Sequence, residues 1–282
     1  MITTSPLRYP GGKARLSPFF AGLIEQFRGS IECYVEPFAG GAGAALELMT
    51  REHVGEIWIN DADPSVYAFW RCVVEDHEYL TSKIADAELS IEEWSAIRKR
   101  YMRRQYAESR WRQRAFDFFY LNRTNRSGIV HTASVIGGKK QDGKWKIDAR
   151  FNRDDLCKRI DFLANYKRRI KVTNLDAVRD MRRFLIKKNA MVYIDPPYYL
   201  AGDRLYMNRL THEDHARLAR KIRKSESNWV LTYDNHEEIR ALYKELPHMN
   251  FDTSYSLHSA REESELLYAS RSVRNALQAH SA

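Results

Sequence analysis

The residue types best suited to chemistry lie in one short run, AMVYIDPPYY at positions 190–199. Residues 191–194 are apolar and partly β-branched, which is typical of a strand buried on both faces of a parallel sheet. Ligands of open α/β sheets bind just beyond the carboxyl ends of such strands. Asp195 directly follows this expected strand, so its carboxylate stands where a ligand is expected.

The two prolines after Asp195 predict a stiff turn, because each fixes φ and removes a backbone donor. The turn is expected to hold the carboxylate of Asp195, the carbonyl of Pro196 and the aromatic face of Tyr198 close together. Two acceptors beside a stacking surface suit a flat base that carries an amino group. A packed proline turn is the competing interpretation of the tetrapeptide alone, and the other motifs decide between the two.

A glycine-rich turn near the start of the chain indicates a second ligand site. Residues 33–36 are expected to form a strand that runs into EPFAGGAG at 36–43 and then a helix over 44–50. The backbone N–H groups of such a turn and helix start are open to a ligand. The dinucleotide fingerprint is not matched, because Leu46 stands where its last glycine belongs, and this disfavours a nicotinamide cofactor.

An acidic residue ends the second expected strand, residues 56–60 (EIWIN). Asp61 lies 18 residues after Gly43, where a carboxylate can accept hydrogen bonds from ribose hydroxyls. Capping of the helix that begins at Pro64 is the competing role for Asp61. Asp63 is better placed for capping, since it directly precedes the proline.

The charge distribution predicts where a polyanion binds. The 282 residues carry a formal net charge of +9, and the segment 94–153 holds 16 Lys and Arg against 4 Asp and Glu. Aromatic residues are interleaved with this charge, which favours a phosphate-binding lobe over the alternative of a solvated basic helix.

The sequence also predicts the cellular compartment of the protein. No run approaches the roughly 18 apolar residues of a membrane span, and the N-terminus lacks the apolar core of a signal peptide. Cys33, Cys72 and Cys157 are odd in number and scattered, which is typical of a reducing cytosol. We therefore expect a cytoplasmic protein without a membrane partner.

Three motifs in the same order, YVEPFAGGAG, IWIND and VYIDPPYY, preceded by LRYPGGK, make the chain similar to the Dam-type DNA adenine-N6 methyltransferases. The resemblance implies S-adenosylmethionine as methyl donor and an α/β fold with a Rossmann-like sheet flanked by helices. By the same resemblance the catalytic residues are Asp195, Pro196, Pro197 and Tyr198. The implied cofactor-binding residues are Tyr9 (often Trp in relatives), Lys13, Glu36, Phe38, Gly40, Gly43, Asp61 and Asp195.

The resemblance also implies a mostly helical DNA-reading lobe between the glycine-rich turn and the tetrapeptide. Residues 1–76 and 165–282 are expected to form the catalytic domain, and residues 77–164 the target-recognition domain. Within the lobe, 129–136 and 144–147 are predicted to be the strands of a β-hairpin, a ribbon that can enter a major groove. The residues expected to contact DNA are Arg123, Asn125, Arg126, Ser127, His131, Lys139, Lys140 and Lys144.

The lobe departs from the family pattern at one point. Relatives that read GATC tend to have Tyr-Asn before the lobe's glycine and an arginine shortly after it. This chain has Arg126 and Ser127 before Gly128, and His131 after it, so the recognition sequence is left open. His212 and His215 have no third ligand at metal-binding spacing, and no metal site is expected.

The remaining strands of the sheet are expected at 170–173, 229–233, 251–257 and 266–269. The expected reaction is site-specific transfer of a methyl group from S-adenosylmethionine to N6 of adenine in double-stranded DNA, after the base is flipped out of the duplex. Two alternatives stay open, an N4-cytosine methyltransferase and a DNA-binding regulator without activity. The oligomeric state also stays open, as does pairing with a cognate restriction or defence protein.

Overall fold

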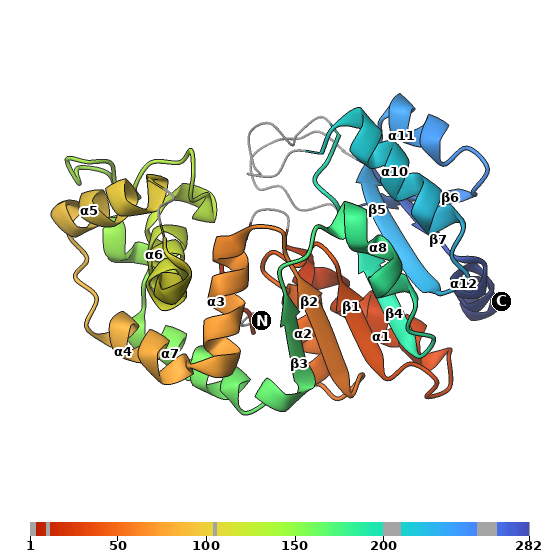
Figure 1. Cartoon of the computed structure of the whole chain (residues 1–282), viewed down its shortest axis with the longest axis horizontal. Helices are drawn as coiled ribbons and strands as arrows, with labels where there is room; N and C mark the ends of the chain where they lie inside the picture. The colour runs from red at the N-terminus through yellow and green to blue at the C-terminus, as the bar shows by residue number, and fades with distance from the viewer. Residues whose placement is uncertain (1–3, 10–11, 104–105, 200–209, 253–263, 282) are drawn as a thin grey trace.

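Seven strands form one sheet in the computed structural model, which describes residues 4–9, 12–103, 106–199, 210–252 and 264–281 (Figure 1). The strand order is β3-β2-β1-β4-β5-β7-β6. The strands are β1 Cys33–Glu36, β2 Glu56–Asn60, β3 Ile170–Thr173, β4 Ala190–Ile194, β5 Asn228–Asp234, β6 His248–Asp252 and β7 Ser264–Ala269.

Strands β1 to β5 run parallel, whereas β7 lies antiparallel between β5 and β6. The chain winds outward from β1 through β2 to β3, and then returns to the other side of β1 with β4. Such a reversal opens a crevice beyond the carboxyl ends of the two central strands. β1 and β4 are these strands, and they carry the glycine-rich turn and the Asp-Pro-Pro-Tyr tetrapeptide.

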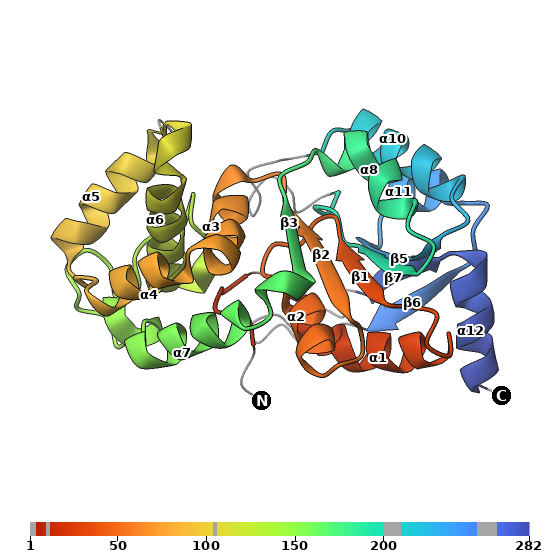
Figure 2. The same cartoon turned by 60° about the horizontal axis from the view of Figure 1, so that its bottom comes forward.

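The expected α/β fold is confirmed, because helices cover both faces of the sheet (Figure 2). Along β4, Met191 and Tyr193 pack into one apolar cluster while Val192 and Ile194 pack into the other. One face carries the 3₁₀ helix η1 Lys13–Leu16 with α1 Ser17–Glu25, α2 Gly43–Thr50 and α12 Arg271–Ser281. The other face carries α8 Ala177–Leu185, α10 His212–Arg223 and α11 Glu237–Leu242.

The strand bounds follow the prediction closely. β1, β2 and β3 begin and end where expected, and β4, β5 and β7 extend the expected strands by one or two residues. The strand expected at 251–257 is shifted, since β6 spans His248–Asp252 and residues 253–257 lie outside the described part of the chain.

A helical lobe lies beside the β3 edge of the sheet, as both views show. Its apolar cluster is continuous with the cluster under one face of the sheet, and α3 packs directly against α6. The boundaries 77 and 164 therefore stay a prediction, because α3 belongs to both parts. The helices are α3 Pro64–Glu75, α4 His77–Ala85, α5 Ile91–Met102, α6 Trp111–Thr124 and α7 Arg153–Ala164, with short 3₁₀ turns at Glu108–Arg110, Arg126–Gly128, Ile147–Arg150 and Lys167–Arg169.

The predicted β-hairpin at 129–136 and 144–147 is wrong, since neither segment is a strand in the described structure. The side chain of Gln141 replaces the expected ladder: its Nε2 donates to the carbonyls of Ile136 (2.8 Å) and Gly138 (2.6 Å), and its Oε1 accepts from the N–H of Ile147 (2.8 Å). Gly137 and Gly138 have φ of +83° and +75°, which bends the backbone away from an extended strand. The lysines of this segment therefore lie on a compact loop.

Candidate active site

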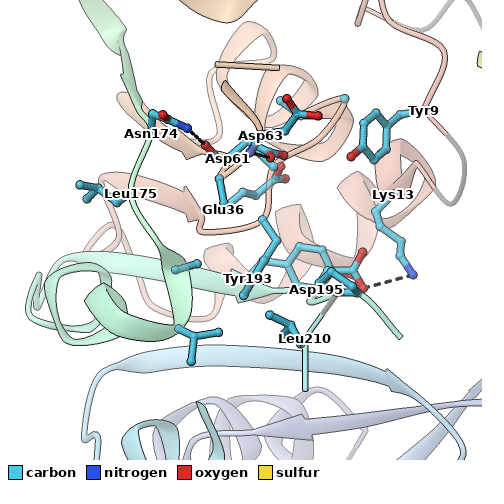
Figure 3. Close-up of a pocket in the computed structure, with 18 of the residues that line it drawn as sticks. Tyr9, Lys13, Glu36, Asp61, Asp63, Asn174, Leu175, Tyr193, Asp195 and Leu210 are labelled. Atoms are coloured by element: carbon cyan, nitrogen blue, oxygen red, sulfur yellow. Dashed lines mark hydrogen bonds and ion pairs between the residues drawn. The ribbon is translucent and has the colours of Figure 1, made fainter. Parts of the chain in front are cut away.

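A cavity of about 640 Å³ opens at the carboxyl ends of the central strands (Figure 3). The glycine-rich turn after β1, the acid after β2 and the tetrapeptide after β4 all contribute to its wall. Of the residues predicted to bind cofactor or substrate, the lining includes Tyr9, Lys13, Glu36, Phe38, Gly43, Asp61, Asp195 and Pro197. It also includes Asp63, Asn174, Leu175, Asp176 and Tyr193.

The glycine-rich turn is tied to the acid that follows β2. The N–H of Gly40 donates to Oδ2 of Asp61 (2.9 Å), and the N–H of Asp63 donates to its Oδ1 (2.8 Å). Gly40 has φ of +47°, and a Cβ at this position would come within 2.4 Å of Cε1 of Tyr9. Burial, with the nearby charge of Asp63, raises the pKa of Asp61 to about 7.

One hydrogen bond shows which of Asp61 and Asp63 caps the helix that begins at Pro64. Oδ1 of Asp63 accepts from the N–H of Ser65 (2.7 Å) at the start of α3. Asp63 therefore caps the helix, as its place before Pro64 predicted, and Asp61 faces the cavity.

Asn60, which the sequence analysis did not single out, holds three strand ends together beneath the cavity. Its Nδ2 donates to the carbonyls of Pro37 (2.8 Å) and Leu175 (3.1 Å). Its Oδ1 accepts from the N–H of Leu175 and the hydroxyl of Thr173, both at 2.8 Å. The available signal was an amide at the end of an otherwise apolar strand, where a buried polar group needs partners.

Glu36 places a carboxyl group on the cavity wall at the end of β1. Its Oε1 accepts from the N–H of Ala45 (3.1 Å) at the start of α2. Burial raises its pKa to about 8, and the charge of Asp195 adds to that shift. Five further carboxylates line the same cavity, so its wall is acidic although the chain as a whole is basic; together the six are Glu36, Asp61, Asp63, Asp176, Asp195 and Asp214.

Asp195 is oriented by a hydroxyl pair behind it. Its Oδ1 accepts from Oγ1 of Thr232 (2.8 Å) on β5, and that hydroxyl also hydrogen-bonds to the phenol of Tyr193 (2.8 Å). Burial raises the pKa of Asp195 above its ordinary value, while the ammonium group of Lys13 opposes the shift. About 20% of the Asp195 side chain is exposed, so its carboxylate can still meet a ligand in the cavity.

Lys13 lies between two carboxylates next to the tetrapeptide. Its Nζ is 3.0 Å from both oxygens of Glu265 and 3.5 Å from Oδ1 of Asp195, and it donates to the hydroxyl of Tyr198 (2.8 Å). The same Tyr198 hydroxyl also donates to Glu265. Burial alone would lower the pKa of Lys13, but the two carboxylates raise it above its usual value.

The residues predicted to contact DNA divide into exposed and buried groups. Exposed side chains are found at Arg126, Ser127, Lys139, Lys140 and Lys144. Asn125 is fully buried: its Oδ1 accepts from the indole of Trp94 (2.8 Å), and its Nδ2 donates to the carbonyl of Ile129 (2.9 Å). The amide of Asn125 is used inside the lobe, and this argues against the DNA contact predicted for it.

Arg123 and His131 join the lobe to the rest of the molecule. Nη1 of Arg123 donates to the carbonyl of Pro6 (3.4 Å), while its Nε donates to the carbonyl of Arg150 within the lobe (2.7 Å). Burial lowers the pKa of Arg123 to about 10. Nε2 of His131 lies 3.8 Å from Oδ2 of Asp63, and its ring packs on Tyr101 with centroids 5.4 Å apart. A residue of the predicted DNA lobe thus approaches an acid of the cavity wall.

The described ranges contain no group of three or more His, Cys, Asp or Glu side chains arranged to hold a metal ion. None of their helices combines the length and the apolar character needed to cross a bilayer. Cys33, Cys72 and Cys157 are free thiols.

Comparison with known proteins agrees with this geometry. Residues 9–262 match the family of D12 class N6 adenine-specific DNA methyltransferases. The type II methyltransferase M.MjaIII of Methanocaldococcus jannaschii is 24% identical over 202 residues, 68% of each chain. The rRNA methyltransferase aviRa of Streptomyces viridochromogenes aligns over 94% of this chain and 87% of that chain, with 14% identity and a TM-score of 0.33. The match across most of its length shows that the chain belongs to the D12 class of DNA methyltransferases, enzymes that methylate adenine at N6.

Proposed function

We propose that this enzyme uses S-adenosylmethionine to methylate an adenine flipped out of double-stranded DNA, with Asp195 and the carbonyl of Pro196 holding the amino group. The observation that carries the proposal is that one acidic cavity is lined by both the glycine-rich turn and Asp195. Flipping is required because N6 cannot be reached inside a duplex.

The charge of the cavity fits the methyl donor. S-adenosylmethionine supplies a methyl group on a positively charged sulfur, and it also carries an ammonium group and ribose hydroxyls. Carboxylates at Glu36 and Asp195 suit the positive groups, while Asp61 suits the hydroxyls. The N–H groups of Gly43 and Ala44 at the start of α2 suit a carboxylate of the ligand, while that of Ala45 is bound to Glu36.

The protein's own contribution to the chemistry is to reshape the amino group of adenine. The lone pair of that nitrogen is delocalised into the ring, which makes it a poor nucleophile. Two acceptors that hold both N–H groups draw the nitrogen toward a tetrahedral geometry and free the lone pair, a form of electrostatic preorganisation. The ring of Tyr198 offers a stacking surface beside them, so the base can be held in line with the donor.

Asp195 is too weak a base to deprotonate the neutral amine, because the ordinary pKa of an Asp is about 3.9. The proton leaves during or after transfer, when the nitrogen has become cationic and acidic. Burial raises the pKa of Asp195, which makes its carboxylate a better acceptor for that proton.

The test is replacement of Asp195 by Ala. We expect methylation to be abolished while affinity for DNA is retained, because the substitution removes an acceptor in the cavity and leaves the lobe intact. Mass spectrometry of digested DNA measures N6-methyladenine, and fluorescence anisotropy measures DNA binding. Asp161→Ala, at an exposed position of α7, is the matched control. Near-normal turnover of Asp195→Ala would show that the acceptor role is wrong.

The same digest separates the remaining alternatives. N4-methylcytosine would identify the cytosine-directed activity, which the family assignment disfavours. Failure to bind S-adenosylmethionine would instead favour a DNA-binding regulator. Mapping modified positions in DNA from cells that express the chain would give the recognition sequence and show whether it matches the site of a neighbouring nuclease.

A further inference from the structure

Glu265 lies beside the tetrapeptide but belongs to none of the three sequence motifs. It is placed there by β7, whose antiparallel pairing aligns Glu265 with Asp234 at the carboxyl end of β5. The residue is 8% exposed, and its carboxylate accepts hydrogen bonds from Lys13 and Tyr198. Glu265 is therefore a buried carboxylate that contacts two residues of the active centre.

The distances show which carboxylate holds Lys13. Its Nζ is 3.0 Å from Glu265 and 3.5 Å from Asp195 (Figure 3 shows the longer contact). In the described part of the chain these are the two anions within ion-pair distance of Lys13. Without the charge of Glu265, the ammonium group would be left with Asp195 alone, and the attraction would draw it there.

A close pair between Lys13 and Asp195 would interfere with the reaction. Oδ1 of Asp195 already accepts from Thr232, so a direct Lys13 contact would occupy acceptor capacity that the adenine amine needs. The ammonium group would also repel a nitrogen that becomes cationic during transfer.

We propose that Glu265 is a positioning residue that holds Lys13 and the hydroxyl of Tyr198 in place and so leaves Asp195 free to accept the amino group of adenine. The inference rests on the proposed function of Asp195. Two residues that are 252 positions apart in the sequence, Lys13 and Glu265, thus meet at the active centre.

Lys13 and Glu265 shift the pKa of Asp195 in opposite directions. Burial raises the pKa of Asp195 most, Lys13 lowers it and the charge of Glu265 raises it. Five further titratable groups lie close enough to interact with Asp195, namely Tyr34, Glu36, Tyr193, Tyr198 and Tyr233. Glu265→Gln leaves these five residues in place and removes only the charge of Glu265, so the pKa of Asp195 falls.

A double-mutant cycle tests the proposal. Glu265→Gln keeps the size of the side chain and removes its charge, and we expect kcat to fall roughly tenfold to a hundredfold. The Kd values for S-adenosylmethionine and DNA should stay within about threefold. The substitution is expected to disturb the geometry of Lys13 and Asp195 in the reaction and not the binding of either ligand. In a Lys13→Met background, the same substitution should cost about threefold or less, since no ammonium group is left to restrain.

The pH profile gives a readout that a general loss of structure would not produce. The acid limb of kcat should move to lower pH in Glu265→Gln, because the pKa of Asp195 falls. Glu56→Gln is the matched control, since it also breaks a Glu–Lys pair, with Lys187 at the amino ends of the strands. Unfolding temperatures of all variants identify any that fail to fold, and Glu265→Asp, which keeps the charge, should restore the profile.

Two results would overturn the role of Glu265. One is an equal loss of kcat in both backgrounds, and the other is an unchanged acid limb in Glu265→Gln. Either result combined with an inactive Asp195→Ala would remove the positioning role alone. An active Asp195→Ala would instead remove the proposed function itself.

Discussion

Glu36 shows how a single residue in this enzyme can sense the charge of its ligand. Its carboxyl group is buried at the end of β1, and its pKa is about 8 instead of the ordinary 4.5. Near neutral pH the group is therefore largely protonated in the protein alone. A cation in the cavity stabilises the ionised form, so binding of a positively charged donor has to release a proton.

This linkage predicts a pH-dependent affinity for S-adenosylmethionine. Between pH 6 and pH 7 the Kd should decrease as pH rises, by at most about tenfold for each proton released. Asp61, with a pKa of about 7, contributes in the same direction. Calorimetry in buffers of different ionisation heat measures the released protons, and Glu36→Gln should release fewer. A Kd that does not change over this interval would contradict the expected linkage.

At the residue scale, sequence position predicted roles that depend on near neighbours. Asp63 was expected to cap α3 because it precedes Pro64, and its bond to Ser65 confirms this. Glu265 could not be assigned in this way, since its partner Lys13 is 252 residues away. A carboxylate in a strand has no local signature of a distant ammonium group.

At the scale of elements, the sheet was easier to predict than the lobe. Central parallel strands are buried on both faces, so short apolar runs such as β4 mark them clearly. The sequence pattern at 137–147 predicts part of a hairpin, because glycines and alternating apolar and polar residues are typical of one. The same pattern also occurs in a compact loop. What decided between the two was Gln141, whose amide satisfies three backbone groups.

Gly128 gives a prediction about how the lobe is attached. Its φ is +75°, and a Cβ would lie 2.1 Å from the carbonyl oxygen of Arg8. Asn122 of α6 binds both the N–H and the carbonyl of Arg8 in the same place. We expect Gly128→Ala to lower the free energy of unfolding by about 2–4 kcal/mol through strain and overpacking.

Gly138→Ala is the control for that substitution. Gly138 has the same φ of +75°, but a Cβ there would have nothing within 4 Å. It should therefore cost about 1 kcal/mol, for the left-handed backbone alone. Denaturant unfolding compares the two, and equal losses would mean that the contact with Arg8 has no energetic weight.

At the scale of the whole molecule, charge is separated between two functions. The segment 94–153 holds 16 of the 46 basic residues and 4 of the 37 acidic ones, whereas the cavity wall contains six carboxylates. Under the proposed function, the basic segment attracts the phosphates of DNA. The acidic cavity then disfavours phosphate and suits the cationic donor, so the sign of the charge separates the two ligands.

This separation predicts a strong effect of salt on DNA binding. The logarithm of the association constant should fall with the logarithm of salt concentration, with a slope of about −0.9 per phosphate contacted. Lys140→Gln and Lys144→Gln, both on the exposed loop, should each reduce that slope by about one unit. Lys187→Gln, whose partner is Glu56, should leave it unchanged. A slope near zero for the unmodified enzyme would exclude the basic segment as the DNA surface.

The meeting of Lys13 with Glu265 also bears on how the enzyme is made. Lys13 precedes Glu265 by 252 residues, so a nascent chain can complete the glycine-rich turn and the helical lobe before β7 leaves the ribosome. Until β7 pairs with β5, Asp195 is the one anion among the described residues that remains within ion-pair distance of Lys13. Under the proposed role of Glu265, a nascent chain without β7 therefore has an impaired methylating centre, which limits methylation of chromosomal DNA by an unfinished polypeptide.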